Sequence, residues 1–272
     1  DRKESLGVFI SSLSFTKQEQ FRVKWSVGSL VISIPFALSL VLATIMRAAN
    51  WAWIQEFYNG YFDFDMMSCD TLVAVVATLL QTYLFFIAFY SFLMLMQTLM
   101  ANNIAASIVG SIVLVVPWFL LEAGSSTLSH ILQKDLRIYG NNRWVNPYNL
   151  ILIRRVSYVP NSIGGNIVTY QNYWLEIIIL LLIAIASICT GIWFYGKNDN
   201  SRNGYLTMFL WVESILILGV TLCSSIVGNH LLRSVVRNPN TIYELVTLII
   251  GGIVGYLVIG KITSVLGRCG HD

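Results

Sequence analysis

Charged residues are scarce in this chain. Asp, Glu, Lys and Arg make up 11% of its 272 residues, whereas hydrophobic residues make up 56%. A typical soluble domain carries roughly 25% charged residues, so this scarcity excludes an ordinary soluble globular protein. The formal net charge of +3 is too small to indicate nucleic acid as a partner.

Motifs that carry chemistry are also lacking. The four cysteines, Cys69, Cys189, Cys223 and Cys269, are scattered and do not have the spacing of a disulfide framework or a zinc site. The three histidines are isolated in the sequence, and no GxxxxGK[ST] nucleotide-binding loop occurs. We therefore expect no catalytic, metal or cofactor site in this chain, and we do not predict an enzyme.

Long apolar runs are what the sequence has instead. A helix that crosses the bilayer needs about 20 predominantly apolar residues. Six segments qualify, over residues 25–46, 71–100, 104–121, 175–195, 205–227 and 242–262. Backbone polar groups in lipid must be hydrogen-bonded within their own segment, and continuous apolar runs do not fit a barrel. The predicted fold is therefore an all-α polytopic transmembrane bundle of six spans.

Lysine and arginine in the loops indicate the orientation of the spans. We place the N-terminal segment, residues 1–24, and the tail, residues 263–272, in the cytoplasm. The basic residues on that side are Arg2, Lys3, Lys17, Arg22, Lys24, Lys197, Arg202, Lys261 and Arg268, against Arg47, Arg233 and Arg237 in the short outer loops. The long loop, residues 122–174, also carries basic residues, but long loops follow this rule less closely. We expect that loop to be extracellular.

Two parts of the long loop have a recognisable pattern. Apolar residues recur at helical spacing from Leu128 to Tyr139, which predicts a short amphipathic helix. This helix could touch lipid at the outer interface or pack over the bundle. The stretch Asn146–Pro160 is rich in β-branched residues, and we expect it to be irregular or extended.

The N-terminal segment is also amphipathic. If this segment is helical, four apolar side chains share one face: Leu6, Phe9, Ile10 and Leu13. A charged cluster precedes them, and a polar patch leads directly into the first span. This pattern predicts a short cytoplasmic helix. It could rest on lipid headgroups or contact a protein partner.

This segment resembles the coupling region of the ABC-2 type permeases, which are membrane subunits of ABC transporters. In that family a charged stretch and a Thr-Leu-like start precede a Leu-Ser-Leu-Pro-x-Ser-Arg-like turn, an aromatic residue and a lysine. Here Ser5-Leu6 occupies the first position and Ser12–Lys17 the turn, with Phe21 and Lys24 after it. Ser14 replaces the usual proline and Lys17 the usual arginine.

The resemblance implies a function and partners. The family's coupling helix docks into a separate ATP-binding subunit, and here it would comprise Leu6, Phe9, Ile10, Leu13, Ser14, Phe15, Thr16 and Lys17. The chain would bind no cofactor itself, since ATP would be bound by the partner. It would pair with a second permease, as a homodimer or heterodimer, in a bacterial cell membrane. It would export a peptide, an antibiotic or another amphiphile. Two further spans would precede Asp1.

Polar residues within the spans leave other functions open. Glu213 lies inside the predicted fifth span, and a carboxylate there is costly, which marks it as a functional candidate. It could line a transport pathway or couple a proton in a secondary transporter, although a structural role, hydrogen-bonded to a neighbouring helix, is the favoured interpretation. A sensor or immunity subunit that transports nothing is a further alternative. Gln81 and Gln97 are expected to donate hydrogen bonds between helices, and Gly251 and Gly255 to form a close-packing face.

Overall fold

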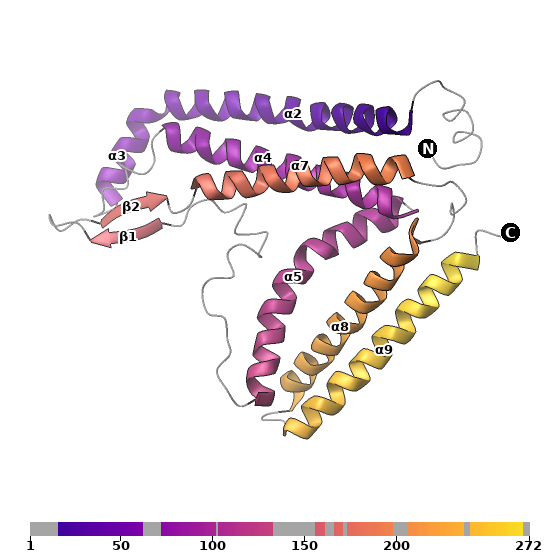
Figure 1. Ribbon diagram of the computed structural model, residues 1–272. Helices are drawn as coiled ribbons and strands as arrows, with labels where there is room; N and C mark the ends of the chain where they lie inside the picture. Colours follow the sequence, from indigo (N-terminus) through magenta and orange to yellow (C-terminus); the bar gives the residue numbers. More distant parts are fainter. Residues whose placement is uncertain are drawn as a thin grey trace. The chain divides into compact units, whose positions relative to one another are not determined.

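The computed structural model describes residues 16–61, 72–101, 103–132, 156–160, 166–170, 173–197, 206–236 and 240–268. Six of its helices are long and apolar enough to cross a membrane. They are α2 (Lys17–Ala49), α4 (Leu72–Leu99), α5 (Asn103–Leu132), α7 (Tyr173–Lys197), α8 (Leu210–Val235) and α9 (Thr241–Arg268). The shorter helix α3 (Trp51–Tyr61) follows α2 directly. The predicted fold class, an all-α polytopic bundle, is confirmed (Figure 1).

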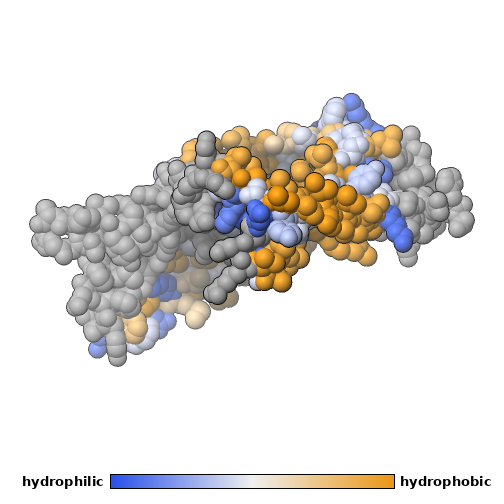
Figure 2. Space-filling model, turned by 90° about the horizontal axis from the view of Figure 1, so that it is seen from below, coloured by the Kyte–Doolittle hydropathy of each residue, from blue (hydrophilic) through white to orange (hydrophobic). Residues whose placement is uncertain are grey.

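The surface of the described residues is unlike that of a soluble protein. Large apolar residues such as Val31 and Leu257 are 65% and 63% exposed. The polar side chains of Gln81 and Asn229 are 0% exposed. Figure 2 shows hydrophobic side chains gathered over part of one face, among the described residues. Lipid is the solvent that such a surface requires, because burying polar groups and exposing apolar ones is unfavourable in water.

The chain forms two compact units. In one of them, helices α5, α8 and α9 lie side by side (Figure 1). The other contains α2, α3, most of α4 and most of α7. It also contains a two-stranded antiparallel hairpin, β1 (Val156–Pro160) and β2 (Asn166–Tyr170). We expected residues 146–160 to be irregular or extended. Residues 156–160 form β1, residues 146–155 lie outside the described residues, and the pairing with β2 was not predicted.

The fifth span begins later than predicted. We expected it at residues 205–227, whereas α8 begins at Leu210 and ends at Val235. The residues just before α8 are extended and pair with the end of α4. The amide of Ala101 donates to the carbonyl of Leu206 (3.1 Å), and that of Met208 donates to the carbonyl of Leu99 (2.9 Å). These groups are therefore not available for a helical turn. The apolar run continues through this pairing, so it does not reveal the boundary.

The third span ends later than predicted. We expected it to end at Leu121, but α5 continues to Leu132 without interruption. The first residues of the expected extracellular loop are thus helical, and residues 128–132 of the predicted amphipathic helix belong to α5. Residues 133–139 of that prediction lie outside the described residues. Ala123 and Thr127 are buried, at 7% and 5% exposure, so packing supports the extension. Gly124 does not end the helix, because one glycine costs a helix only about 1 kcal/mol.

Candidate functional site

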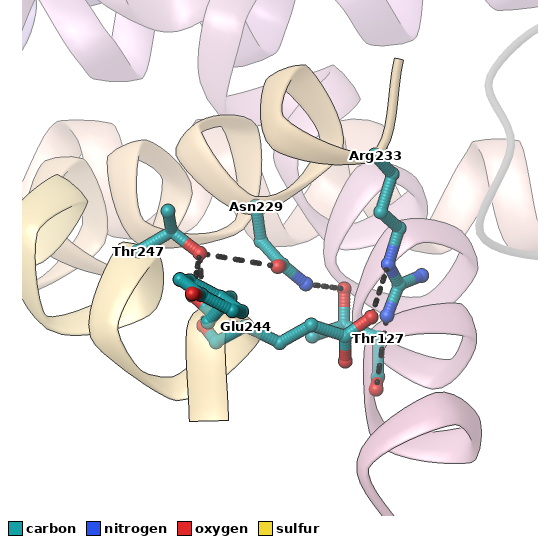
Figure 3. Close-up of polar contacts among 6 residues, drawn as sticks. Thr127, Asn229, Arg233, Glu244 and Thr247 are labelled. Atoms are coloured by element: carbon teal, nitrogen blue, oxygen red, sulfur yellow. Dashed lines mark hydrogen bonds and ion pairs between the residues drawn. The ribbon is translucent and has the colours of Figure 1, made fainter. Parts of the chain in front are cut away.

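A cluster of buried and half-buried polar side chains joins the ends of α5, α8 and α9 (Figure 3). It comprises Thr127 on α5, Asn229 and Arg233 on α8, and Glu244 and Thr247 on α9. Arg233 lies in the last turn of α8 and Glu244 in the first turn of α9. Each charge is therefore stabilised by the dipole of its helix, which favours a cation at the C-terminal end and an anion at the N-terminal end.

An ion pair lies at the centre of this cluster. Nε of Arg233 donates to Oε1 of Glu244 at 2.9 Å, and the two side chains are 14% and 3% exposed. Nη2 of the arginine also reaches the carbonyl of Thr127 at 3.5 Å. A buried charge without a partner is costly, so each charge stabilises the other in this position.

Asn229 extends the cluster across all three helices. Its Nδ2 donates to Oγ1 of Thr127 at 3.4 Å, and its Oδ1 accepts from Oγ1 of Thr247 at 3.4 Å. Oε2 of Glu244 is buried and accepts no hydrogen bond from the described residues. The cluster can therefore accept one more hydrogen bond. It contains no nucleophile with an adjacent base, so its chemistry suits binding or structural coupling rather than catalysis.

The glycines predicted to form a packing face contact α8 of the same chain. A Cβ atom added at Gly251 would lie 2.7 Å from the carbonyl oxygen of Ser224, and one added at Gly255 would collide with the Ser224 hydroxyl. That hydroxyl donates to the carbonyl of Gly251 at 2.8 Å. The small residues thus let α8 and α9 approach closely and exchange a hydrogen bond. This packing holds the two halves of the polar cluster together.

Interhelical hydrogen bonds also connect α4 to its neighbours in the other unit. Nε2 of Gln81 donates to Oε2 of Glu176 on α7 at 2.8 Å, and Gln81 is fully buried. Gln81 therefore forms the kind of bond expected of it. Toward α2, the indole of Trp25 donates to Oγ of Ser91 at 2.9 Å. Gln97 is half-buried on α4.

Most of the predicted coupling residues lie outside the described residues, namely Leu6, Phe9, Ile10, Leu13, Ser14 and Phe15. Thr16 and Lys17 are described. Thr16 immediately precedes α2, and Lys17 is its first residue. The last residue of the predicted segment is therefore the first residue of α2.

Glu213 is not deep within a helix, as the predicted span had placed it. It lies in the first turn of α8, and its amide donates to the carbonyl of Phe209 at 3.4 Å. A carboxylate there is favoured by the positive end of the helix dipole. The argument that this side chain must have a function because of its depth therefore no longer holds.

Sequence reasoning missed the Arg233–Glu244 pair. It placed Arg233 in an outer loop and did not single out Glu244. A signal was available in the sequence. The two opposite charges lie on either side of a short connection between two spans, and helices joined by a short connection lie close together at that end, so the charges could have been expected to pair. In the part of the chain that the structure describes, no group of three or more His, Cys, Asp and Glu side chains could hold a metal ion.

Comparison with known proteins does not identify the chain. No protein-family model, curated protein or solved structure matches it. What is established is therefore a multi-pass membrane protein with a polar cluster inside one of its units.

Proposed function

We propose that this chain is the membrane-spanning subunit of a bacterial ABC exporter of the ABC-2 permease type. One observation carries the proposal. The segment that resembles the family's coupling region, Ser5–Lys17, ends at the first residue of α2, a helix of 33 residues that can span the membrane. A push on this segment would therefore act at the end of a transmembrane helix.

The contacts of α2 suggest how such a push would spread. Near the start of α2, the Tyr90 hydroxyl donates to the carbonyl of Lys24 at 3.2 Å. Two turns further along, the hydroxyls of Ser33 and Tyr83 lie 2.8 Å apart. A Cβ atom added at Gly28 would collide with the Tyr90 hydroxyl, so the two helices approach closely between these bonds. Movement of α2 is thus expected to carry α4 with it.

The proposed transport cycle is conformational. ATP binding and hydrolysis on separate subunits would move the coupling segment and α2, and the pathway would form between two permeases. A substrate shifts such an equilibrium only by binding the two states with different affinity, so it must contact helices that move. Peptides, antibiotics and other amphiphiles would suit a pathway without fixed charge better than inorganic ions do.

The competing proposal, a secondary transporter, loses its main support. It depended on Glu213 as a carboxylate deep in the membrane, and Glu213 lies in the first turn of α8. Transport in vesicles separates the two proposals. Export that requires ATP and continues after the proton gradient is dissipated fits the ABC exporter, whereas export driven by the gradient alone contradicts it.

The partner can be tested by copurification. The natural protein is expressed with its genomic neighbours, and we expect an ATPase subunit to copurify with it. Lys17→Glu and Leu13→Trp should reduce both recovery of the ATPase and ATP hydrolysis. Lys261→Glu is the matched control, since it reverses a predicted cytoplasmic charge outside the coupling segment. If Lys17→Glu and Leu13→Trp leave recovery and hydrolysis unchanged, the coupling assignment is wrong.

A further inference from the structure

A recess lies where α2 ends and α3 begins. Its volume is about 590 Å³, and it is lined by side chains from α2, α3 and α4 together with the residue between α2 and α3. The lining residues are Ala43, Met46, Arg47, Asn50, Trp53, Ile54 and Val75. Of these, Arg47 alone carries a charge. The recess therefore combines one cation with a largely apolar wall.

The polar part of the recess has the residues typical of a membrane–water boundary. Arg47 lies in the last turn of α2, and its guanidinium carbon lies 5.6 Å from the centre of the Trp51 ring. Trp53 stacks on Phe57 with ring centres 5.5 Å apart and is itself 63% exposed. Tryptophan is enriched at the level of lipid headgroups, so this aromatic group places Arg47 at headgroup depth.

The apolar part of the recess continues onto the lipid-facing surface. Met46 lines the recess and is 65% exposed. Its neighbours on α2, Leu42 and Ile45, are 59% and 58% exposed. A molecule that occupies the recess therefore meets a cation at one end and a hydrocarbon-like surface along the rest. This is the chemistry of an anionic amphiphile.

We propose that the recess binds an anionic membrane phospholipid. The guanidinium of Arg47 donates to the phosphate, since arginine presents a planar set of donors that matches phosphate oxygens. The amide side chain of Asn50 lies beside the headgroup, and an acyl chain follows Ala43, Met46 and Val75. A free phosphate ion would leave this apolar wall in contact with water, so a lipid is the occupant that the lining favours. The site does not depend on the proposed transport function.

Binding is tested with the full chain purified in detergent. Native mass spectrometry measures its affinity for phosphatidylglycerol and for phosphatidylcholine with the same acyl chains. We expect tighter binding of phosphatidylglycerol, and Arg47→Gln should weaken that binding about fivefold. Arg47→Lys should keep more of the affinity than Arg47→Gln. Arg22→Gln removes the same charge near the opposite end of α2 and should have no such effect. Equal losses in Arg47→Gln and Arg22→Gln would overturn the proposal.

A second measurement needs no variant. A photoactivatable phosphatidylglycerol is added to the unmodified protein in nanodiscs, and the cross-linked peptides are identified. We expect labelling of residues 43–54 or of the segment around Val75, and we expect no competition from millimolar inorganic phosphate. Labelling spread evenly over the lipid-facing helices would show bulk lipid only. Loss of labelling in phosphate would show a site for a free anion. Either result would overturn the proposal.

Discussion

Arg233 and Glu244 form a buried ion pair between the last turn of α8 and the first turn of α9, with Nε and Oε1 2.9 Å apart. Arg233 is one of three basic residues that we assigned to the short outer loops, whereas the structure places it in the last turn of a helix that can span the membrane. The pair therefore joins the ends of two neighbouring helices.

The ion pair predicts a specific pattern of stability. Glu244→Gln or Arg233→Gln alone leaves a buried charge without its partner, and each should lower the free energy of unfolding by about 3 kcal/mol. The double variant Arg233→Met with Glu244→Leu should recover most of that loss, because well-packed apolar residues can replace a buried pair. Unfolding in mixed detergent micelles measures all three. If the double variant loses as much free energy of unfolding as the two single variants together, this interpretation is wrong.

The contact between α8 and α9 predicts that alanine substitutions at two glycines of α9 differ strongly in their effect on stability. Gly251→Ala would place a methyl group 2.7 Å from the backbone carbonyl oxygen of Ser224, which cannot rotate away. We expect a destabilisation of roughly 1–3 kcal/mol, as for overpacking elsewhere. Gly260→Ala on the same helix is the control, since nothing lies within 4 Å of the added atom. Equal effects of the two substitutions on unfolding would refute this packing.

The bond between Gln81 and Glu176 predicts a smaller effect. Interhelical hydrogen bonds in membrane proteins contribute about 0.6 kcal/mol on average and up to about 1.7 kcal/mol. Gln81 is fully buried, so Gln81→Leu should fall toward the upper end of that range. Thr190→Ala is a suitable control, because its hydroxyl is exposed and bonds to the carbonyls of Ala186 and Ser187 within its own helix. If both substitutions change the unfolding free energy equally, this bond does not connect α4 and α7 in the membrane.

The predicted orientation can be tested by cysteine labelling. Lys17 and Asn50 are exposed at opposite ends of α2. In a background with the four native cysteines replaced by serine, a membrane-impermeant maleimide should label Asn50→Cys in intact cells. It should label Lys17→Cys only after the membrane is permeabilised. The reverse pattern would place the coupling segment outside the cell, and no cytoplasmic ATPase could then reach it.

The sequence was sufficient to predict the spans but not their ends. An apolar run shows only that a segment avoids water. The extended residues before Leu210 and the helix that follows belong to the same run, so the run does not show where the helix begins. The extension of α5 past Leu121 depends on packing around Thr127, and packing between helices cannot be predicted from a local sequence pattern. The polar cluster was missed for the same reason. Asn229 and Thr127 are ordinary polar residues in sequence, and only the arrangement of the helices brings them together.

Cross-linking from the coupling segment tests the central claim most directly. A photo-crosslinking amino acid is placed at position 13 of the natural protein, expressed with its genomic neighbours, and at position 34 as a lipid-facing control, where Ile34 is 61% exposed. We predict that position 13 forms a covalent adduct with an ATPase subunit, that the amount of adduct changes when ATP is bound, and that position 34 forms none. No ATPase adduct at position 13, although the complex is intact, would contradict the assignment of this chain as an ABC permease.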